Sequence, residues 1–309
     1  MAMSKKEIKD KNKYYFYVPI YGIIINGSYK IGEFELCDRN TFLNRIKDED
    51  IRNKVAIGED AKYYLSILAV SNDRREAQRI AYKKTVEFKR LMDFACGRGN
   101  SVPAVNIRQY VASSEKCLIL SDMDSNVYVS EEINNNYIPI DHKIEDLVAE
   151  MENNKTSYIW DLYSKPNKSD RENRILNAIL WVGKAHIETD NRIYFLELCF
   201  ALESLLHIEM DKFLNPSIAY SISTSCAIII ADDFKDREKV VKTLKDVYRK
   251  RSNIAHGKNI DISNVDCETL FMYIAYLLND LSSKEPWNKF VSMQELWLEI
   301  EKIKLGKEL

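Results

Sequence analysis

The sequence predicts an α+β protein in which a β-rich N-terminal domain, residues 1–140, precedes an all-α helical bundle, residues 141–309. Runs of β-branched and aromatic residues dominate the first part of the chain, whereas apolar residues at helical spacing extend almost to the C-terminus. The two patterns meet at polar, turn-forming residues between Asn134 and Pro139. With 309 residues, 46% hydrophobic content and 30% charged residues, the chain has the composition of a globular protein of two domains.

Strand candidates fill most of the first part. Residues 14–37 contain two β-rich runs around Asn26-Gly27, and we expect a two-residue hairpin turn there because both positions tolerate positive φ. Pro19 has no N–H to donate to a strand ladder, so it should lie on a sheet edge or at a bulge. Further strands are expected in residues 61–70, 104–112, 116–122 and 125–132.

One long helix is expected within the β-rich domain, from Asp73 to about Cys96, because apolar residues recur there with helical spacing. Gly97 is suited to end it. The helix is strongly basic, which indicates either a solvated face or a surface for RNA or a partner. Its basic residues are Arg74, Arg75, Arg79, Lys83, Lys84, Lys89 and Arg90.

Five further helices are expected after the boundary, and residues 292–305 have the pattern of a sixth. Ser169 or Asp170 is suited to cap the first of them, which should run to about Glu188. Short connections favour antiparallel packing into a bundle. The others are expected in residues 192–210, after Pro216, in residues 236–256 and in residues 267–281.

Charge and cysteine content narrow the class of protein. The formal net charge of −2 and the pI near 6.2 argue against a general binder of polyanions, so a nucleic-acid site would have to be local. The charged N-terminus and the absence of a long apolar run predict a cytoplasmic protein without a membrane span. The six cysteines stand far apart, which predicts reduced thiols, no zinc site and no dense disulfide framework. They are Cys37, Cys96, Cys117, Cys199, Cys226 and Cys267.

The helix expected in residues 236–256 places a charge among apolar side chains. On a helical wheel of about 100° per residue, Arg251 falls inside the apolar stripe. Because burying an unpaired ion is costly, Arg251 should pair with an acid or face a cleft. Glu203, which stands in the very apolar segment 192–210, is the preferred partner, with another structural contact as its alternative role. The stripe comprises Val240, Leu244, Val247, Tyr248, Ile254 and Ala255.

His256 stands near the end of the same helix, about 140° from Arg251 on the wheel, and Gly257 suits the left-handed residue that ends a helix. A guanidinium can hold a phosphate through two bonds, and an imidazole can take or give a proton near neutral pH. These are the parts needed to cleave a phosphodiester without a metal. Because the two groups diverge on one straight helix, we expect a homodimer with a composite site.

The segment VYRKRSNIAHGK, together with FLELCFALESLL upstream, resembles the HEPN superfamily, in particular its Apea-like branch. The resemblance covers roughly residues 169–283. It implies an all-helical, commonly dimeric domain, and many members are metal-independent ribonucleases with an Arg-x4–6-His signature at a helix end. By position, the signature residues are Arg251 and His256, and Ser252 between them suits the Apea-like branch.

The resemblance implies an endoribonuclease that acts in antiphage defence, with the N-terminal domain as a sensor or regulator of a phage-derived or nucleotide trigger. The expected reaction is attack of an RNA 2′-hydroxyl on the neighbouring phosphate, giving a 2′,3′-cyclic phosphate, with Arg251 and His256 as the catalytic residues. No cofactor is expected. The alternative is a non-catalytic module that dimerises and binds RNA or protein, in which both residues are structural.

Several polar residues around this pair are candidates for supporting roles. Ser252 and Asn253 are candidates to donate hydrogen bonds to the phosphate, although polar residues at helix ends often satisfy only backbone groups. Four basic residues are candidates to bind the RNA backbone, or else form a solvated face. They are Lys245, Arg249, Lys250 and Lys258. The remaining histidines lack such a context and are expected to be structural: His142, His186 and His207.

Overall fold

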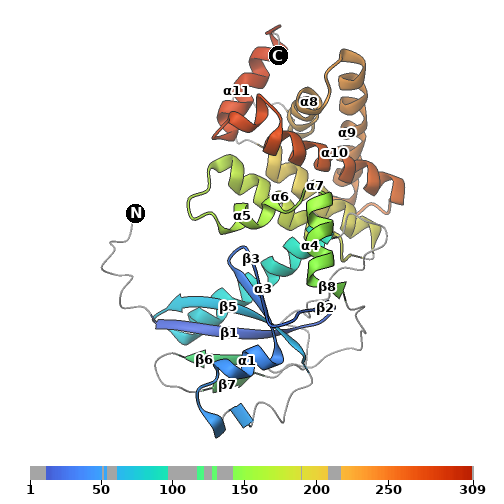
Figure 1. Ribbon diagram of the computed structural model, residues 1–309. Coiled ribbons are helices and arrows are strands. Elements are labelled where there is room, and N and C mark those ends of the chain that lie inside the picture. The colour runs from blue at the N-terminus through green and yellow to red at the C-terminus, as the bar shows by residue number, and fades with distance from the viewer. Residues whose placement is uncertain are drawn as a thin grey trace. The chain divides into compact units, whose positions relative to one another are not determined.

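The computed structural model describes residues 12–50, 52–53, 61–96, 117–121, 127–130, 142–188, 190–207 and 217–307. It has the α+β organisation that the sequence predicts, with an antiparallel sheet in the N-terminal part and a succession of helices after it (Figure 1). The chain forms two compact units, Met1–Ser164 and Lys165–Leu309.

The sheet of the first unit has six antiparallel strands in the order β3-β4-β5-β1-β6-β7, and β2 pairs separately with β8 in parallel. The neighbours β1 and β5 are about fifty residues apart in sequence, a separation on which short-range patterns carry no information. The strands are β1 Asn12–Ile20, β2 Ile23–Ile24, β3 Ser28–Ile31, β4 Phe34–Asp38, β5 Tyr63–Ser71, β6 Cys117–Ser121, β7 Val127–Ser130 and β8 His142–Lys143. The strand expected in residues 104–112 lies outside the described residues.

The hairpin expected at Asn26-Gly27 is wrong. That turn connects β2 and β3, which lie in different sheets, and the hairpin closes instead at Gly32 and Glu33, between β3 and β4. Gly27 does adopt a positive φ of 75°, but its N–H donates to the carboxylate of Asp38 at 2.7 Å and its carbonyl accepts the Asp38 N–H at 2.8 Å. A contact eleven residues away therefore fixes this turn.

Pro19 lies within β1, which is a central strand of the sheet and not an edge. On the β5 side Pro19 faces Tyr64, whereas the pairing of β1 with β6 covers only Tyr14 to Tyr17. Among the described residues, β1 thus has no ladder partner on its β6 side at the position where proline lacks an N–H. The expectation of an edge strand is therefore wrong, although the described pairing of β1 with β6 stops before Pro19.

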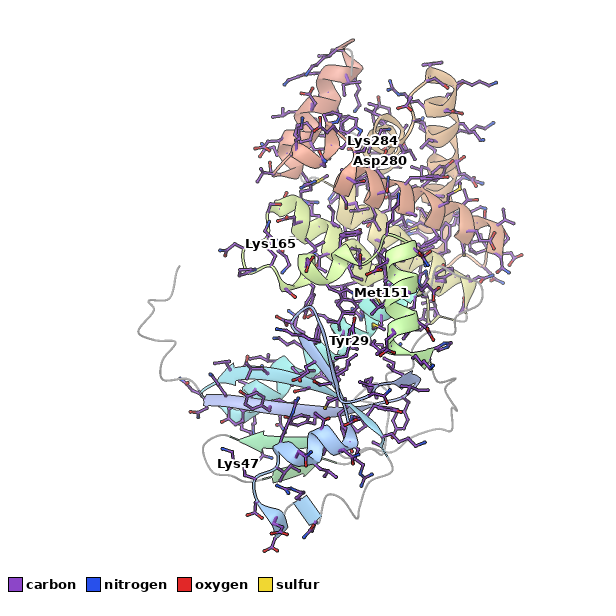
Figure 2. The ribbon with its side chains drawn as sticks, viewed as in Figure 1. Tyr29, Lys47, Met151, Lys165, Asp280 and Lys284 are labelled. Atoms are coloured by element: carbon purple, nitrogen blue, oxygen red, sulfur yellow. The ribbon has the colours of Figure 1, made fainter. Side chains whose placement is uncertain are left out.

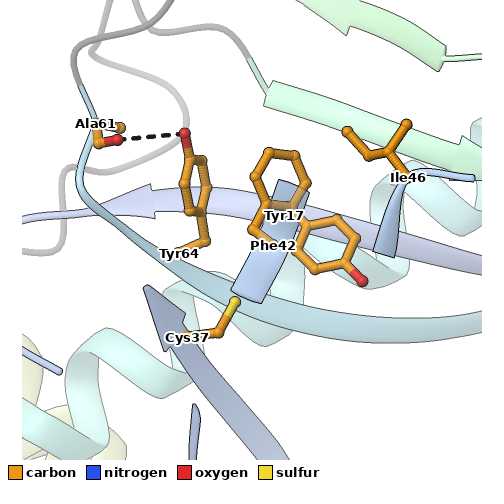
Figure 3. Close-up of a cluster of buried hydrophobic side chains, with 6 residues drawn as sticks. All are labelled: Tyr17, Cys37, Phe42, Ile46, Ala61 and Tyr64. Atoms are coloured by element: carbon orange, nitrogen blue, oxygen red, sulfur yellow. Dashed lines mark hydrogen bonds between the residues drawn. The ribbon is translucent and has the colours of Figure 1, made fainter. Parts of the chain in front are cut away.

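A buried aromatic cluster joins the sheet to helix α1, Arg39–Arg45 (Figure 3). The ring of Phe42 on α1 lies 4.7 Å from that of Tyr17 on β1 and 4.4 Å from that of Tyr64 on β5. Asp38 begins α1 because its carboxylate accepts the N–H of Thr41 at 2.7 Å. The cluster comprises Tyr17, Cys37, Phe42, Ile46, Ala61 and Tyr64.

Two short helices, α4 Ile144–Asn153 and α5 Tyr158–Ser164, belong to the first unit. Trp160 on α5 packs its ring 6.3 Å from that of Phe34 on β4 and 5.6 Å from that of Phe88 on the long helix. The hydroxyl of Tyr163 donates to Glu87 at 2.6 Å. These contacts place the division between the units after Ser164, later than the boundary expected near residue 140.

The long helix expected in the first domain is present as α3, Arg74–Cys96, whereas Gly97 lies outside the described residues. Much of its basic surface is paired with carboxylates: Lys84 with Glu33 at 2.8 Å, and Lys83 with Glu87 at 3.8 Å. Lys89 is not part of a solvated face, because it is buried and its ammonium lies 2.6 Å from the carboxylate of Asp93.

The second unit contains all six helices predicted from the sequence, and each of the six begins at a side-chain cap. Ser169 and Glu172 form a reciprocal capping box at the start of α6, as Ser263 and Asp266 do for α10. The helices are α6 Asp170–Ala185, α7 Asn191–Leu206, α8 Ile218–Ile230, α9 Phe234–Ala255, α10 Asn264–Ser283 and α11 Met293–Lys304, with a 3-10 turn at Trp287–Lys289.

The helices of this unit pack in pairs. Helix α6 packs along α7, α8 along α9, and α10 against both α7 and α8. At the end of α10, the ammonium of Lys284 lies 3.6 Å from Asp280 and 3.4 Å from Asp232, which belongs to the α8–α9 connection (Figure 2). The segment that carries Arg251 and His256 is therefore the end of a helix held by several neighbours.

Candidate functional site at the end of helix α9

Helix α9 buries the apolar stripe that the sequence predicts, as far as Tyr248. Arg251 follows one turn later and is partly exposed, Ile254 is half-buried and Ala255 is exposed. Ala255, which the sequence places in the apolar stripe, is therefore not buried. Arg251 stands at the border between the core and the surface.

Arg251 is paired with Glu203 on α7, and the predicted ion pair is confirmed. Nε of Arg251 lies 3.2 Å from Oε1 of Glu203, and Nη2 lies 3.3 Å from Oε2. Glu203 thus faces the Nε–Nη2 edge of the planar guanidinium. The Nη1 edge has no partner among the described residues, which leaves donors for an oxyanion such as a phosphate.

The contact at Nε is close enough for an ion pair, but its N–H is not aimed at the carboxylate well enough for a hydrogen bond. The pair therefore consists of one hydrogen bond, from Nη2, and one charge contact, at Nε. A poor angle weakens a hydrogen bond more than it weakens Coulomb attraction. With both side chains partly exposed, at 32% for Arg251 and 21% for Glu203, the pair orients the guanidinium more than it stabilises the fold.

The side chains beneath this pair are apolar or neutral. Tyr248 is buried, and its hydroxyl has no hydrogen-bond partner among the described residues. Burial, and then the charge of Glu203, raise the pKa of Tyr248 and that of Cys199. Neither group ionises near neutral pH, so Glu203 supplies the negative charge that contacts Arg251 in the described part of the chain.

His256 is the residue at which α9 ends. The N–H of Gly257 donates to the carbonyl of Ile254 and that of Lys258 to the carbonyl of Asn253, both at 2.9 Å, and Gly257 has a φ of +73°. This is the Schellman arrangement, and it fixes the backbone that carries the imidazole. The side chain of His256 is exposed and makes no hydrogen bond, ion pair or ring contact with the described residues, Arg251 included.

A histidine at a helix end is a recurring feature of this unit. His186 ends α6 and His207 ends α7, as His256 ends α9. The ring of His186 packs 5.3 Å from that of Phe271, and His207 is partly buried, whereas His256 is exposed. A cation at this position is favoured by the helix dipole, so the position alone does not assign a function to His256.

The other residues expected near the site have different surroundings. Ser252 is exposed and Asn253 is partly buried, and their carbonyls accept hydrogen bonds of the helix end. Lys250 lies 2.5 Å from the carboxylate of Asp266, so it links α9 to the start of α10 and is the least suited of the four basic candidates to bind RNA.

The other three basic candidates are exposed. Arg249 pairs with Asp246 on the same helix, and the ammonium of Lys245 lies 6.0 Å from the centre of the Tyr220 ring. Lys258 has no ion-pair partner among the described residues. Of the expected site residues, Arg251 and Glu203 are the two whose side chains contact each other in the described chain.

An aromatic pair beside Arg251 was not expected from the sequence. The centre of the Phe200 ring lies 6.0 Å from Cζ of Arg251 and 5.1 Å from the centre of the Trp181 ring. A signal was present in the sequence, because Phe200 precedes Glu203 by three residues and so shares its side of α7.

Comparisons with family models, with curated proteins and with solved structures give no match to this chain. None of the described helices combines the length and apolar character needed to cross a membrane. Within the described ranges, His, Cys, Asp and Glu side chains do not gather in threes or more in a way that would hold a metal ion.

Proposed function

We propose that the protein is a metal-independent endoribonuclease of the HEPN type, with Arg251 and His256 as its catalytic residues. One observation carries the proposal: a guanidinium held by Glu203 along one edge keeps its other edge for a ligand, on a helix whose well-fixed end carries the exposed side chain of His256. These are the two side-chain types that transfer of a phosphate between two RNA oxygens needs.

In the proposed reaction, the imidazole of one His256 takes the proton of a ribose 2′-hydroxyl while that oxygen attacks the adjacent phosphorus. The bond from phosphorus to the 5′-oxygen breaks, and the His256 of a second subunit gives that oxygen a proton. The products are a 2′,3′-cyclic phosphate and a free 5′-hydroxyl. Arg251 neutralises the charge that accumulates on the phosphorane oxygens.

We propose that the protein acts as a homodimer, because a single described chain brings no contact between Arg251 and His256. Two copies whose α9 ends meet at a two-fold axis would place two arginines and two histidines around one phosphate. We assign the first unit to the regulation of this activity by a phage-derived or nucleotide trigger, in a role in antiviral defence. This assignment rests on the family resemblance.

A non-catalytic module that binds RNA or protein is the second candidate. The observation that favours it is the recurrence of histidine at the ends of α6, α7 and α9, which a purely structural preference for a cation at a helix end would explain.

Cleavage of total RNA in EDTA by the purified protein separates the two candidates. We expect Arg251→Ala and His256→Ala to abolish cleavage, and His207→Ala, at another helix end of the same unit, to retain it. Cleavage that persists in both site variants contradicts the assignment. The binding module is favoured if the wild type binds RNA but does not cleave it, with or without extract from infected cells.

A further inference from the structure

A partly exposed aromatic pair lies on the surface beside the candidate site. Trp181 on α6 and Phe200 on α7 have ring centres 5.1 Å apart and planes inclined by 51°. Phe200 is 36% exposed, and Trp181 is partly exposed. The two rings therefore offer aromatic surface to a ligand.

Each ring also has a cation beside it. The ammonium of Lys184 lies 5.2 Å from the centre of the Trp181 ring, and Cζ of Arg251 lies 6.0 Å from the centre of the Phe200 ring. Successive contacts thus link four side chains of α6, α7 and α9, which we call the row, in the order Lys184, Trp181, Phe200 and Arg251. The row ends at the proposed phosphate-binding arginine.

Both cations of this row are more exposed than the carboxylates with which they pair. The side chain of Lys184 is 35% exposed, whereas its partner Glu197, 2.5 Å away, is 5% exposed. Arg251 is likewise more exposed than its partner Glu203. Each cation is therefore held by a less exposed carboxylate, and both the ammonium and the guanidinium remain accessible to an approaching molecule. This surface is complementary to a ligand that is both flat and anionic.

We propose that Trp181 and Phe200 form a stacking platform for an unpaired nucleobase, next to the phosphate that Arg251 binds. Lys184, at the far end of the row, contacts a neighbouring phosphate of the same strand. The inference rests on the proposed ribonuclease function and extends it, because it assigns a base-binding subsite to residues outside the Arg251 and His256 motif. Aromatic platforms flanked by cations bind single strands with little sequence preference, because every base has a flat face.

The size of the surface favours a base over a second protein copy. A stable protein interface buries about 800 Å² on each partner, far more than the exposed parts of two rings. A base covers an area of the order of one or two rings, and its flanking phosphates match the two cations of the row.

Binding is best measured in a His256→Ala background, in which RNA is bound without being cleaved. The probes are a short fluorescent single-stranded oligoadenylate and an abasic strand of equal length and charge. We expect the parent to bind the oligoadenylate about tenfold more tightly than the abasic strand. Trp181→Leu or Phe200→Leu should bring the two affinities together by weakening oligoadenylate binding alone.

Two controls keep the test specific. Tyr276→Leu removes an exposed aromatic ring on α10 that has no cation beside it among the described residues, and it should keep the tenfold preference. Trp181→Phe and Phe200→Tyr retain a ring and should restore the preference, which separates the loss of stacking from the loss of folding.

The platform is contradicted if the leucine variants keep the preference for the oligoadenylate. It is also contradicted if they lose that preference together with a change in molecular mass by light scattering, which would mark the rings as a protein interface.

The platform proposal and the ribonuclease proposal can also fail separately. Cleavage that depends on Arg251 and His256 but not on the rings removes the platform alone. Base-dependent binding without any cleavage removes the ribonuclease alone, and a parent that binds neither strand contradicts both.

Discussion

Glu203 on α7 faces one edge of the Arg251 guanidinium on α9, with Nη2 of the arginine 3.3 Å from Oε2 of the carboxylate. The pair lies at the border of the core, where the buried stripe of α9 ends. A carboxylate in this position restricts the rotation of a long side chain that would otherwise be free at the surface. The role we assign to Glu203 is therefore to position Arg251.

Glu203→Gln tests this role, since it keeps the shape of the side chain and removes its charge. We expect a loss of less than about 1 kcal/mol in the free energy of unfolding, because the pair is partly exposed. RNA cleavage should fall roughly 10- to 100-fold, because a misplaced arginine stabilises the transition state less well. Asp246→Asn is the matched control, since Asp246 pairs with Arg249 on the exposed side of the same helix. Equal activity of the two variants would contradict a positioning role for Glu203.

Gly257→Ala tests whether the fixed end of α9 matters for the site. At a φ of +73° an added Cβ would meet no atom within 4 Å, so the cost is that of the left-handed backbone, about 1–2 kcal/mol. Gly306, at a φ of +101°, ends α11 with the same hydrogen-bond pattern and equally open space. We expect Gly257→Ala and Gly306→Ala to lower the unfolding free energy by similar amounts.

Only the first of these two variants should lose RNA cleavage, because only Gly257 adjoins His256. Thermal unfolding and cleavage assays of both proteins check the expectation. A loss of activity in Gly306→Ala as large as that in Gly257→Ala would mean that stability, and not the position of the imidazole, limits the reaction.

The buried pair on α3 makes the first unit sensitive to pH. Burial raises the pKa of Asp93 to about 6, although Lys89 lies 2.6 Å away and lowers it. In the unfolded chain an aspartate ionises near about pH 4. The stabilising contribution of protonated Asp93 is therefore fully present below about pH 4 and is lost as the pH rises through about 6.

Lys89→Met should destabilise the first unit by about 3 kcal/mol at pH 8, because it leaves the charge of Asp93 without this partner. The loss should be smaller at pH 5, where Asp93 is largely protonated. Arg79→Met, which removes a partner of Glu76 at the surface, should cost less than about 0.5 kcal/mol at either pH. Denaturant unfolding followed by circular dichroism measures all three proteins, and equal losses for Lys89→Met at the two pH values would contradict the account.

The described thiols are buried and should be unreactive in the native protein. Burial raises the pKa of Cys37 and of Cys96 to about 12 and that of Cys267 to about 11. We expect iodoacetamide at pH 8 to leave them unmodified until the protein is denatured, because the thiolate is the reactive form. Mass spectrometry before and after denaturation checks this, and rapid labelling of the native protein would contradict it. The five protected residues are Cys37, Cys96, Cys199, Cys226 and Cys267.

The parts of the fold that depend on nearby residues could be predicted from the sequence. Ser169 caps α6 through contacts within three residues, and Gly257 ends α9 through contacts within five. The partner of Arg251 could also be inferred, because a charge inside an apolar stripe needs an acid and Glu203 stands in a very apolar segment of the sequence.

The parts that depend on distant residues could not be predicted. The Asn26-Gly27 turn is held by Asp38, so its dipeptide signal does not specify a hairpin. Trp160 joins the first unit through Phe34 and Phe88, both far from it in sequence, which places the boundary after Ser164. The aromatic pair beside Arg251 likewise arises from the packing of α6 on α7.

The ends of the RNA fragments provide the most direct test of the central claim, that Arg251 and His256 cleave RNA by internal attack of the 2′-hydroxyl. In EDTA, the wild-type protein should leave 2′,3′-cyclic phosphate and 5′-hydroxyl ends, and Arg251→Ala and His256→Ala should leave none. Fragments with 5′-phosphate and 3′-hydroxyl ends, or cyclic phosphates formed equally by both variants, would contradict the claim.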